Sequence, residues 1–192
     1  MAWIYGNRAL NQTEMENNAL LVRQMFLGFH TGWSLQAIAA LLGNMQSEST
    51  INPGLWENFQ PYWRGYGLVQ WTPYTNYSDW AGANWENNGN KQCMRIEYER
   101  LNHLEWIINP NYPYTWTFDE WHESTDSPTD LARAFLVDYE RPIASVIPSE
   151  LIIRGQQAED WYTFLTGHPY VPFPELKPWM LFQFSKWRRL IK

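Results

Sequence analysis

The chain has 192 residues, a formal net charge of −6 and one cysteine, Cys93. This length suffices for one domain with a sizeable core. The acidic balance argues against nucleic acid as a partner, and a lone cysteine excludes an intrachain disulfide. No apolar run reaches the roughly 18 residues of a transmembrane segment, and residues 1–8 do not have the pattern of a signal peptide.

The first half of the chain predicts two helices. Thr13 and Glu16 have the spacing of a capping box and open a helix that stops near residues 28–32. Ser34 caps a second helix, which is apolar almost all round its first two turns and is therefore expected to be buried. Asn52-Pro53-Gly54 is a turn signal after it.

The chain from residue 62 onward predicts an irregular hairpin followed by three helices. Two glycines among extended-leaning residues over 62–72 favour a short hairpin. A helix is expected over 91–108, ended by Asn109-Pro110. Ser127-Pro128 starts another that runs to Tyr139, and Ser149 starts a last one that ends at Gly167. The pattern as a whole predicts a mainly α domain with a small extended lobe.

The two ends of the chain differ from this middle part. Residues 1–12 form an N-terminal extension, and residues 169–192 form a Pro-rich linker followed by a basic, aromatic tail. The tail either packs back on the acidic domain as a terminal helix, or binds an anionic wall polymer, a membrane surface or a virion.

Glu48 is the candidate catalytic residue. It ends the apolar run 38–49, at the negative end of the helix dipole and near Met45 and Val69. Both surroundings disfavour a carboxylate, so we expect the carboxyl to stay protonated near working pH. Such a group can protonate the leaving oxygen of a glycosidic bond. The alternative is an ordinary solvated acid at a helix end.

The segment 65–73 is the candidate substrate wall. The amide of Gln70 can donate and accept, which suits an N-acetyl group or a sugar hydroxyl. Trp71 offers a face for a pyranose ring, as do the neighbouring Trp56 and Trp63 among thirteen tryptophans. The alternatives are that Gln70 satisfies loop backbone and that the tryptophans fill the core.

Glu48-Ser49 at a helix end, followed by Gly67-Leu68-Val69-Gln70, resembles the phage tail lysozymes, the lysozyme domain of phage morphogenesis proteins, over about residues 11–168. More distantly, it is similar to the soluble lytic transglycosylases. The resemblance implies a lysozyme-like α+β fold over 13–168, with a cleft between the helical part and the lobe. It also implies that Glu48 is the general acid and that Gly67, Gln70, Trp71 and Tyr139 bind substrate.

The resemblance further implies a virion protein that cuts the MurNAc–GlcNAc backbone of peptidoglycan for genome entry, with other tail proteins as neighbours. A free endolysin and a non-catalytic wall-binding or tail-tip module remain as alternatives. Tyr139 resembles the tyrosine that closes the cleft opposite the acid, although a structural tyrosine fits equally well. As an alternative, Glu140 and Arg141, which follow it, are expected to form an ion pair that orders the turn.

The nucleophile and the second catalytic group are not identified by the sequence. A hydrolase needs a second carboxylate, and the candidates on predicted loops are Glu57, Asp119, Glu120 and Asp126. If none serves, the 6-hydroxyl of the sugar attacks and the enzyme is a lytic transglycosylase. Neither cofactor nor metal is expected, because His30, His103, His122 and His168 are scattered. Cys93 is expected to be a packed thiol.

Overall fold

The computed structural model describes residues 1–170, so the predicted tail and all but the start of the linker lie outside the described residues. The elements in chain order are α1 (Gln12–Gly28), α2 (Leu35–Ser49), the 3₁₀ turn η1 (Glu57–Phe59), α3 (Thr75–Ala81), α4 (Gly89–Leu101), α5 (Phe118–Glu123), α6 (Pro128–Phe135), the π-helical turn η2 (Leu136–Glu140) and α7 (Ile147–Gly167). The predicted mainly α, lysozyme-like fold is confirmed. Among residues 1–170, no helix is both long and apolar enough to cross a membrane.

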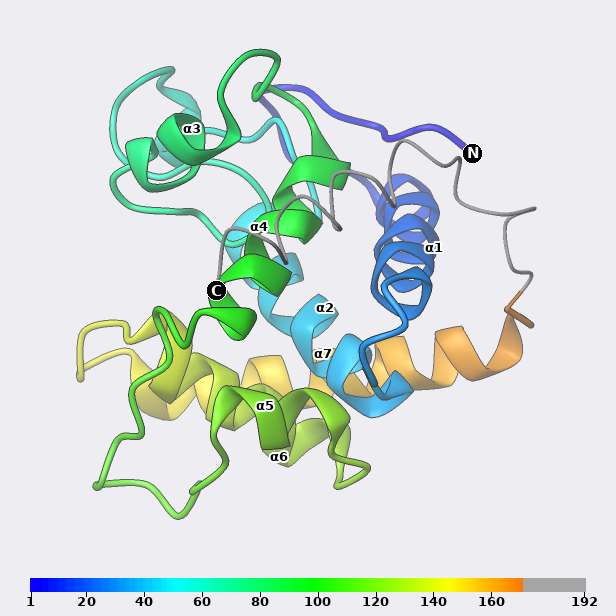
Figure 1. The fold of residues 1–192 in the computed structure, drawn as a ribbon, viewed down its shortest axis with the longest axis vertical. Helices are drawn as coiled ribbons and strands as arrows, with labels where there is room; N and C mark the ends of the chain where they lie inside the picture. Colours follow the sequence, from blue (N-terminus) through cyan, green and yellow to red (C-terminus); the bar gives the residue numbers. More distant parts are fainter. Residues whose placement is uncertain (171–192) are drawn as a thin grey trace.

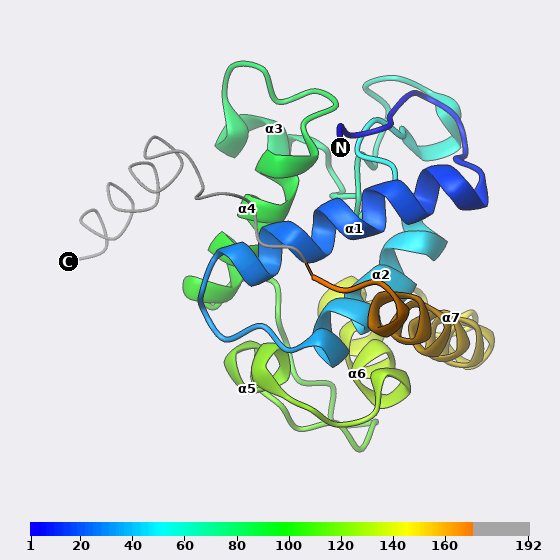
Figure 2. The same ribbon diagram turned by 90° about the vertical axis from the view of Figure 1, so that its right-hand side faces the viewer.

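The second helix lies at the centre of the molecule, as predicted. Every residue from Ala37 to Leu42 is completely buried, because α2 packs against α7, α6, α1 and α5. Figure 1 shows α5, α6 and α7 at one end of the molecule and α3 with its loops at the other, with α2 and α4 between them. The view in Figure 2 shows α1 lying across α2 on the side away from α6.

Gly43 sets how closely helices α2 and α7 approach each other. A Cβ atom at Gly43 of α2 would lie 2.8 Å from the carbonyl oxygen of Arg154 and 2.9 Å from the amide nitrogen of Ala158, both on α7. Backbone cannot yield at such distances, so only glycine allows this packing. The contact fixes the end of α2 relative to the side chains of α7.

Two of the five predicted helix starts were correct, and the other three were placed a few residues late, that of α4 by two. Ser34 Oγ caps α2 and Ser127 Oγ caps α6, each accepting from the amide three residues on. The capping box of α1 is formed by Asn11 and Glu14, two residues earlier than predicted, and Arg8 also pairs with Glu14 at 2.6 Å. The last helix starts at Ile147, so Ser149 lies inside its first turn.

The fourth helix ends seven residues before the predicted stop. His103 adopts a left-handed conformation (φ 53°), the amide of Leu104 donates to Glu99 O and the amide of His103 donates to Arg100 O. These are the two hydrogen bonds of a Schellman motif. A histidine occupies the position where glycine is usual, which explains why the sequence did not mark the end. The short helices α3 and α5 were not predicted either.

The extended lobe contains bridges rather than a regular hairpin. Tyr66 pairs with Trp56 on one side and with Trp71 on the other. Behind these bridges the rings of Trp56, Tyr66, Tyr74, Tyr77 and Trp85 contact one another at centroid distances of 4.4–6.4 Å. An aromatic core therefore adds to the few backbone hydrogen bonds of these bridges.

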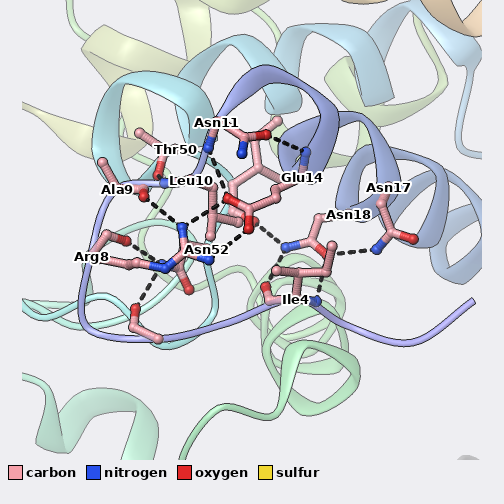
Figure 3. Close-up of polar contacts among 12 residues, drawn as sticks. Ile4, Arg8, Ala9, Leu10, Asn11, Glu14, Asn17, Asn18, Thr50 and Asn52 are labelled. Carbon is pink, nitrogen blue, oxygen red and sulfur yellow. Dashed lines mark hydrogen bonds and ion pairs between the residues drawn. The ribbon is translucent and has the colours of Figure 1, made fainter.

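Hydrogen bonds tie the N-terminal segment to the domain at Ile4 and Leu10, as Figure 3 shows. The buried side chain of Asn18 accepts from the amide of Ile4 and donates to the carbonyls of Ile4 and Ile51. The amide of Leu10 donates to Thr50 Oγ1 at 2.9 Å. Thr50 directly follows α2, so the N-terminal segment helps to hold the helix end that carries Glu48.

Candidate active site

A cleft of about 670 Å³ lies where the end of α2, the extended lobe and the segment after η2 meet. Four carboxyl side chains line it, those of Glu48, Glu57, Glu105 and Glu140. The predicted residues Gln70, Trp71 and Tyr139 line it as well. The fold thus brings together most of the site residues predicted from sequence, although more than ninety positions separate the first from the last.

Glu48 is the last-but-one residue of α2, and its side chain is 20% exposed. Its Oε1 lies 2.5 Å from Nη2 of Arg154, whose own side chain is only 6% exposed. Arg154 also donates to Asn44 Oδ1 and Glu150 Oε2, both at 3.0 Å. The sequence predicted apolar surroundings for Glu48, whereas the structure places the buried cation of Arg154 beside its carboxyl, which the sequence did not indicate.

Glu140 is a further acid of the cleft. Its Oε1 is buried and has no hydrogen-bond partner. Burial is the main reason why the pKa of Glu140 is well above its usual range, and the negative charge of Glu48 adds to the effect, while Arg154 opposes it. Arg141, the hypothetical partner of Glu140, instead pairs with Glu105 at 3.1 Å.

The side chains of the predicted substrate wall are largely held by the protein itself. Gln70 Nε2 donates to the carbonyls of Leu55 and Gly67, at 3.1 and 3.0 Å. Gly67 is buried with φ +81°, and a Cβ there would lie 2.5 Å from the side-chain oxygen of Gln92. Gly67 is therefore required by the loop itself, and the amide of Gln70 closes that loop, as in the structural alternative.

A buried carboxylate ties the walls of the cleft together. Glu99 of α4 accepts hydrogen bonds from Trp71 Nε1 (3.0 Å), Arg95 Nε (2.7 Å) and the hydroxyl of Tyr139 (2.5 Å). Trp71 also stacks on Tyr77, with ring centroids 4.9 Å apart. Trp71 and Tyr139 are both buried, and burial raises the pKa of the Tyr139 hydroxyl well above its usual range. Glu99 connects α4, the lobe and η2, and the sequence analysis missed it.

Of the four candidates for a second carboxylate, Glu57 alone lies in this cleft. Its Oε2 accepts from the amide of Gly65 at 3.0 Å. The other three stabilise α5 and its neighbouring turns: Asp119 pairs with Arg100, Glu120 completes the capping box of α5, and Asp126 accepts from Ser124.

Across residues 1–170, no three His, Cys, Asp or Glu side chains gather in a way that would hold a metal ion. Cys93 is buried as a free thiol, and burial raises its pKa.

The helical fold with an acid at the end of a buried helix, facing a polar and aromatic cleft, defines a lysozyme-like protein. The chain belongs to the phage tail lysozyme family, whose sequence model matches residues 17–165. It is similar to Morphogenesis protein 1 of Bacillus phage B103, with 42% identity over 165 residues, a match that covers 84% of this chain and 42% of that protein. The chain thus spans about two fifths of the length of this relative.

Proposed function

We propose that the chain is a peptidoglycan-degrading glycosidase that cuts the MurNAc–GlcNAc backbone, with Glu48 as general acid. The position of Glu48 at the edge of a cleft of about 670 Å³, with further carboxyls along the same cleft, is the observation that supports this most. Membership of the phage tail lysozyme family supports the same substrate class.

In the proposed reaction Glu48 gives its proton to the glycosidic oxygen as the carbon–oxygen bond breaks, leaving an oxocarbenium-like centre. A nucleophile then attacks this centre, and the Glu48 carboxylate takes the proton of that nucleophile. Arg154 orients the Glu48 carboxyl through the 2.5 Å contact and stabilises the carboxylate formed in the first step. The exposed ring of Phe59, on the rim of the cleft, offers a face for a neighbouring sugar.

The nucleophile is water in a hydrolase and the sugar's own 6-hydroxyl in a lytic transglycosylase. The presence of Glu57 in the cleft favours hydrolysis, because a second carboxylate can hold or activate water. Mass spectrometry of fragments released from purified walls separates the two, since hydrolysis leaves reducing ends and transglycosylation leaves anhydro ends.

The test of Glu48 compares Glu48→Gln with the unaltered chain on isolated walls. Glutamine keeps the shape but has no proton to give, so clearing should fall by roughly 10²–10⁴-fold while the fold and wall binding persist. Asp160→Asn is the matched control, since it removes an exposed acid from α7, the helix of Arg154. Equal clearing by Glu48→Gln and the unaltered chain would end the assignment.

The second candidate function is a wall-binding module without turnover. The ion pair between Glu48 and Arg154 favours it, because a carboxylate held by a guanidinium lacks the proton that the reaction needs. Wall binding by the unaltered chain without any released fragments would support this alternative.

We further propose that the protein acts in the phage tail during genome entry. The similarity to a phage morphogenesis protein supports a virion role, with neighbouring tail proteins as partners. Detection of the chain in purified virions by mass spectrometry tests this proposal, and its absence there would favour a free endolysin.

A further inference from the structure

If Glu48 is the general acid, which is the function proposed above, its carboxyl must carry a proton. Its ion pair with Arg154, however, favours the carboxylate. The carboxyls of Glu48 and Glu140 line the same cleft, and both act electrostatically on the one guanidinium of Arg154. Arg154 also pairs with Glu150 of its own helix at 3.0 Å, so this one cation already faces two carboxylates before Glu140 is counted. A further negative charge in such a buried setting would be left without a partner.

The other charged groups around Glu140 are already compensated. On α4, Glu99 accepts from Arg95, Trp71 and Tyr139. In the chain segment after η2, Arg141 pairs with Glu105. On α7, Glu150 pairs with Arg154 Nε at 3.0 Å, and its side chain is 26% exposed to water. Glu48 from α2 and Glu140 from η2 therefore face a cation that Glu150 already engages.

The geometry of Glu140 makes it the acid that is worse placed to be ionised. The π-helical turn η2 ends at this residue, and Arg141 after it reverses the chain in a left-handed conformation (φ 49°). The Oε1 atom of Glu140 is cut off from solvent and accepts no hydrogen bond. An unpartnered buried oxygen is tolerated far better on a neutral carboxyl than on a carboxylate.

We propose that Glu48 and Glu140 hold one proton between them beside Arg154, so that Glu140 is a positioning residue that keeps this proton available to Glu48. The two forms are Glu48 carboxylate with neutral Glu140, and neutral Glu48 with Glu140 carboxylate. The number of protons and the total charge are the same in both, and the positive charge of Arg154 acts on both carboxyls. The second form is the one that can protonate the glycosidic oxygen.

The raised pKa of Glu140 agrees with this sharing, since the Glu48 charge contributes to the shift after burial. The pair also reconciles a general acid with the short contact to Arg154. It accounts for the fact that an otherwise unexplained buried carboxyl lies in the cleft.

The direct test follows the carboxyl carbons of ¹³C-labelled glutamates by NMR across pH, in the unaltered chain and in two variants. Sharing predicts that Glu140 loses its proton at a pH lower by about one unit in Glu48→Gln, because the like charge is gone. It predicts the same direction for Glu48 in Glu140→Gln. Titration curves that superpose on those of the unaltered chain would overturn the proposal.

Wall clearing supplies a second readout. Since the reaction needs protonated Glu48, its rate falls at high pH, and Glu140→Gln should move this fall to lower pH by about one unit. Asp160→Asn should leave the profile in place. An unshifted profile in a folded Glu140→Gln variant would contradict the sharing.

The two proposals can fail separately. If the unaltered chain clears no walls at any pH, the proposed function fails, while the NMR titration still decides whether the proton is shared. If Glu140→Gln does not fold, the Glu48→Gln titration decides alone.

Discussion

Replacing Glu99 by glutamine should destabilise the fold strongly. Glu99 is completely buried and accepts from three donors, on Trp71, Arg95 and Tyr139. Glutamine keeps one oxygen that can accept from Trp71 and Arg95, and its amide nitrogen can donate to the Tyr139 hydroxyl, but the negative charge is lost. The guanidinium of Arg95, only 10% exposed, would lose its carboxylate.

The size of the effect follows from that unpaired cation. Removing one partner of a buried ion pair costs about 3–5 kcal/mol. For a chain of this length each kcal/mol lowers the melting temperature by about 2–4 °C, so a fall of roughly 6–20 °C is expected. Tyr139→Phe removes one hydrogen bond to the charged group and should cost less, about 1.5–3 kcal/mol.

Thermal and urea unfolding followed by circular dichroism measures both variants. Asp160→Asn, which alters an exposed acid, serves as control and should change stability by less than about 0.5 kcal/mol. A loss below about 1 kcal/mol for Glu99→Gln would show that the buried carboxylate does not hold the cleft walls together, and the reasoning would be refuted.

Two further predictions concern Asp138 and Phe59. Burial raises the pKa of Asp138 from 3.8 to about 6, so its contribution to stability is greatest below about pH 4 and is lost as pH rises through 6. Asp138→Asn should match the unaltered chain at pH 4 and be about 1–2 kcal/mol more stable at pH 7, allowing for screening; urea unfolding showing the same difference at both pH values would contradict this. Phe59→Ala should weaken wall binding in a pelleting assay by roughly 2- to 10-fold with little change in stability, because the ring is 57% exposed on the cleft rim; unchanged binding would exclude the ring from the substrate path.

Local signals predicted the fold where the deciding contacts are local. Ser34 and Ser127 cap helices through bonds to amides three residues away, so the sequence suffices to find them. The apolar run of α2 is also a local signal, and it predicted that this helix is buried. The end of α4 was missed because a histidine takes a conformation usually left to glycine, and α3 and α5 are too short to show a period.

The site residues also divide into those that local sequence marks and those that depend on contacts between distant segments. The place of Glu48 at a helix end was readable, because it depends on the run that precedes it. Its partner Arg154 lies 106 residues away, and nothing near either residue marks the pair. Glu99 was missed for a related reason, since an acid on a helix is normally solvated and three donors from distant segments bury this one.

The long-range part of the site nevertheless has a cause in the sequence. Gly43 precedes Glu48 by five residues on α2 and contacts the backbone of Arg154 and Ala158 on α7 so closely that no side chain fits. Backbone contacts therefore set the distance between α2 and α7. At this distance the side chain of Arg154 on α7 reaches the end of α2. Glu140 arrives by a separate route, through the π-helical turn that continues α6. The proposed acid thus acquires its cation and its second carboxyl from two packing events, neither of which involves the motif that identifies it. A protein that kept the motif but altered either packing contact would keep its resemblance to the family and lose the arrangement on which the proposed sharing of a proton depends.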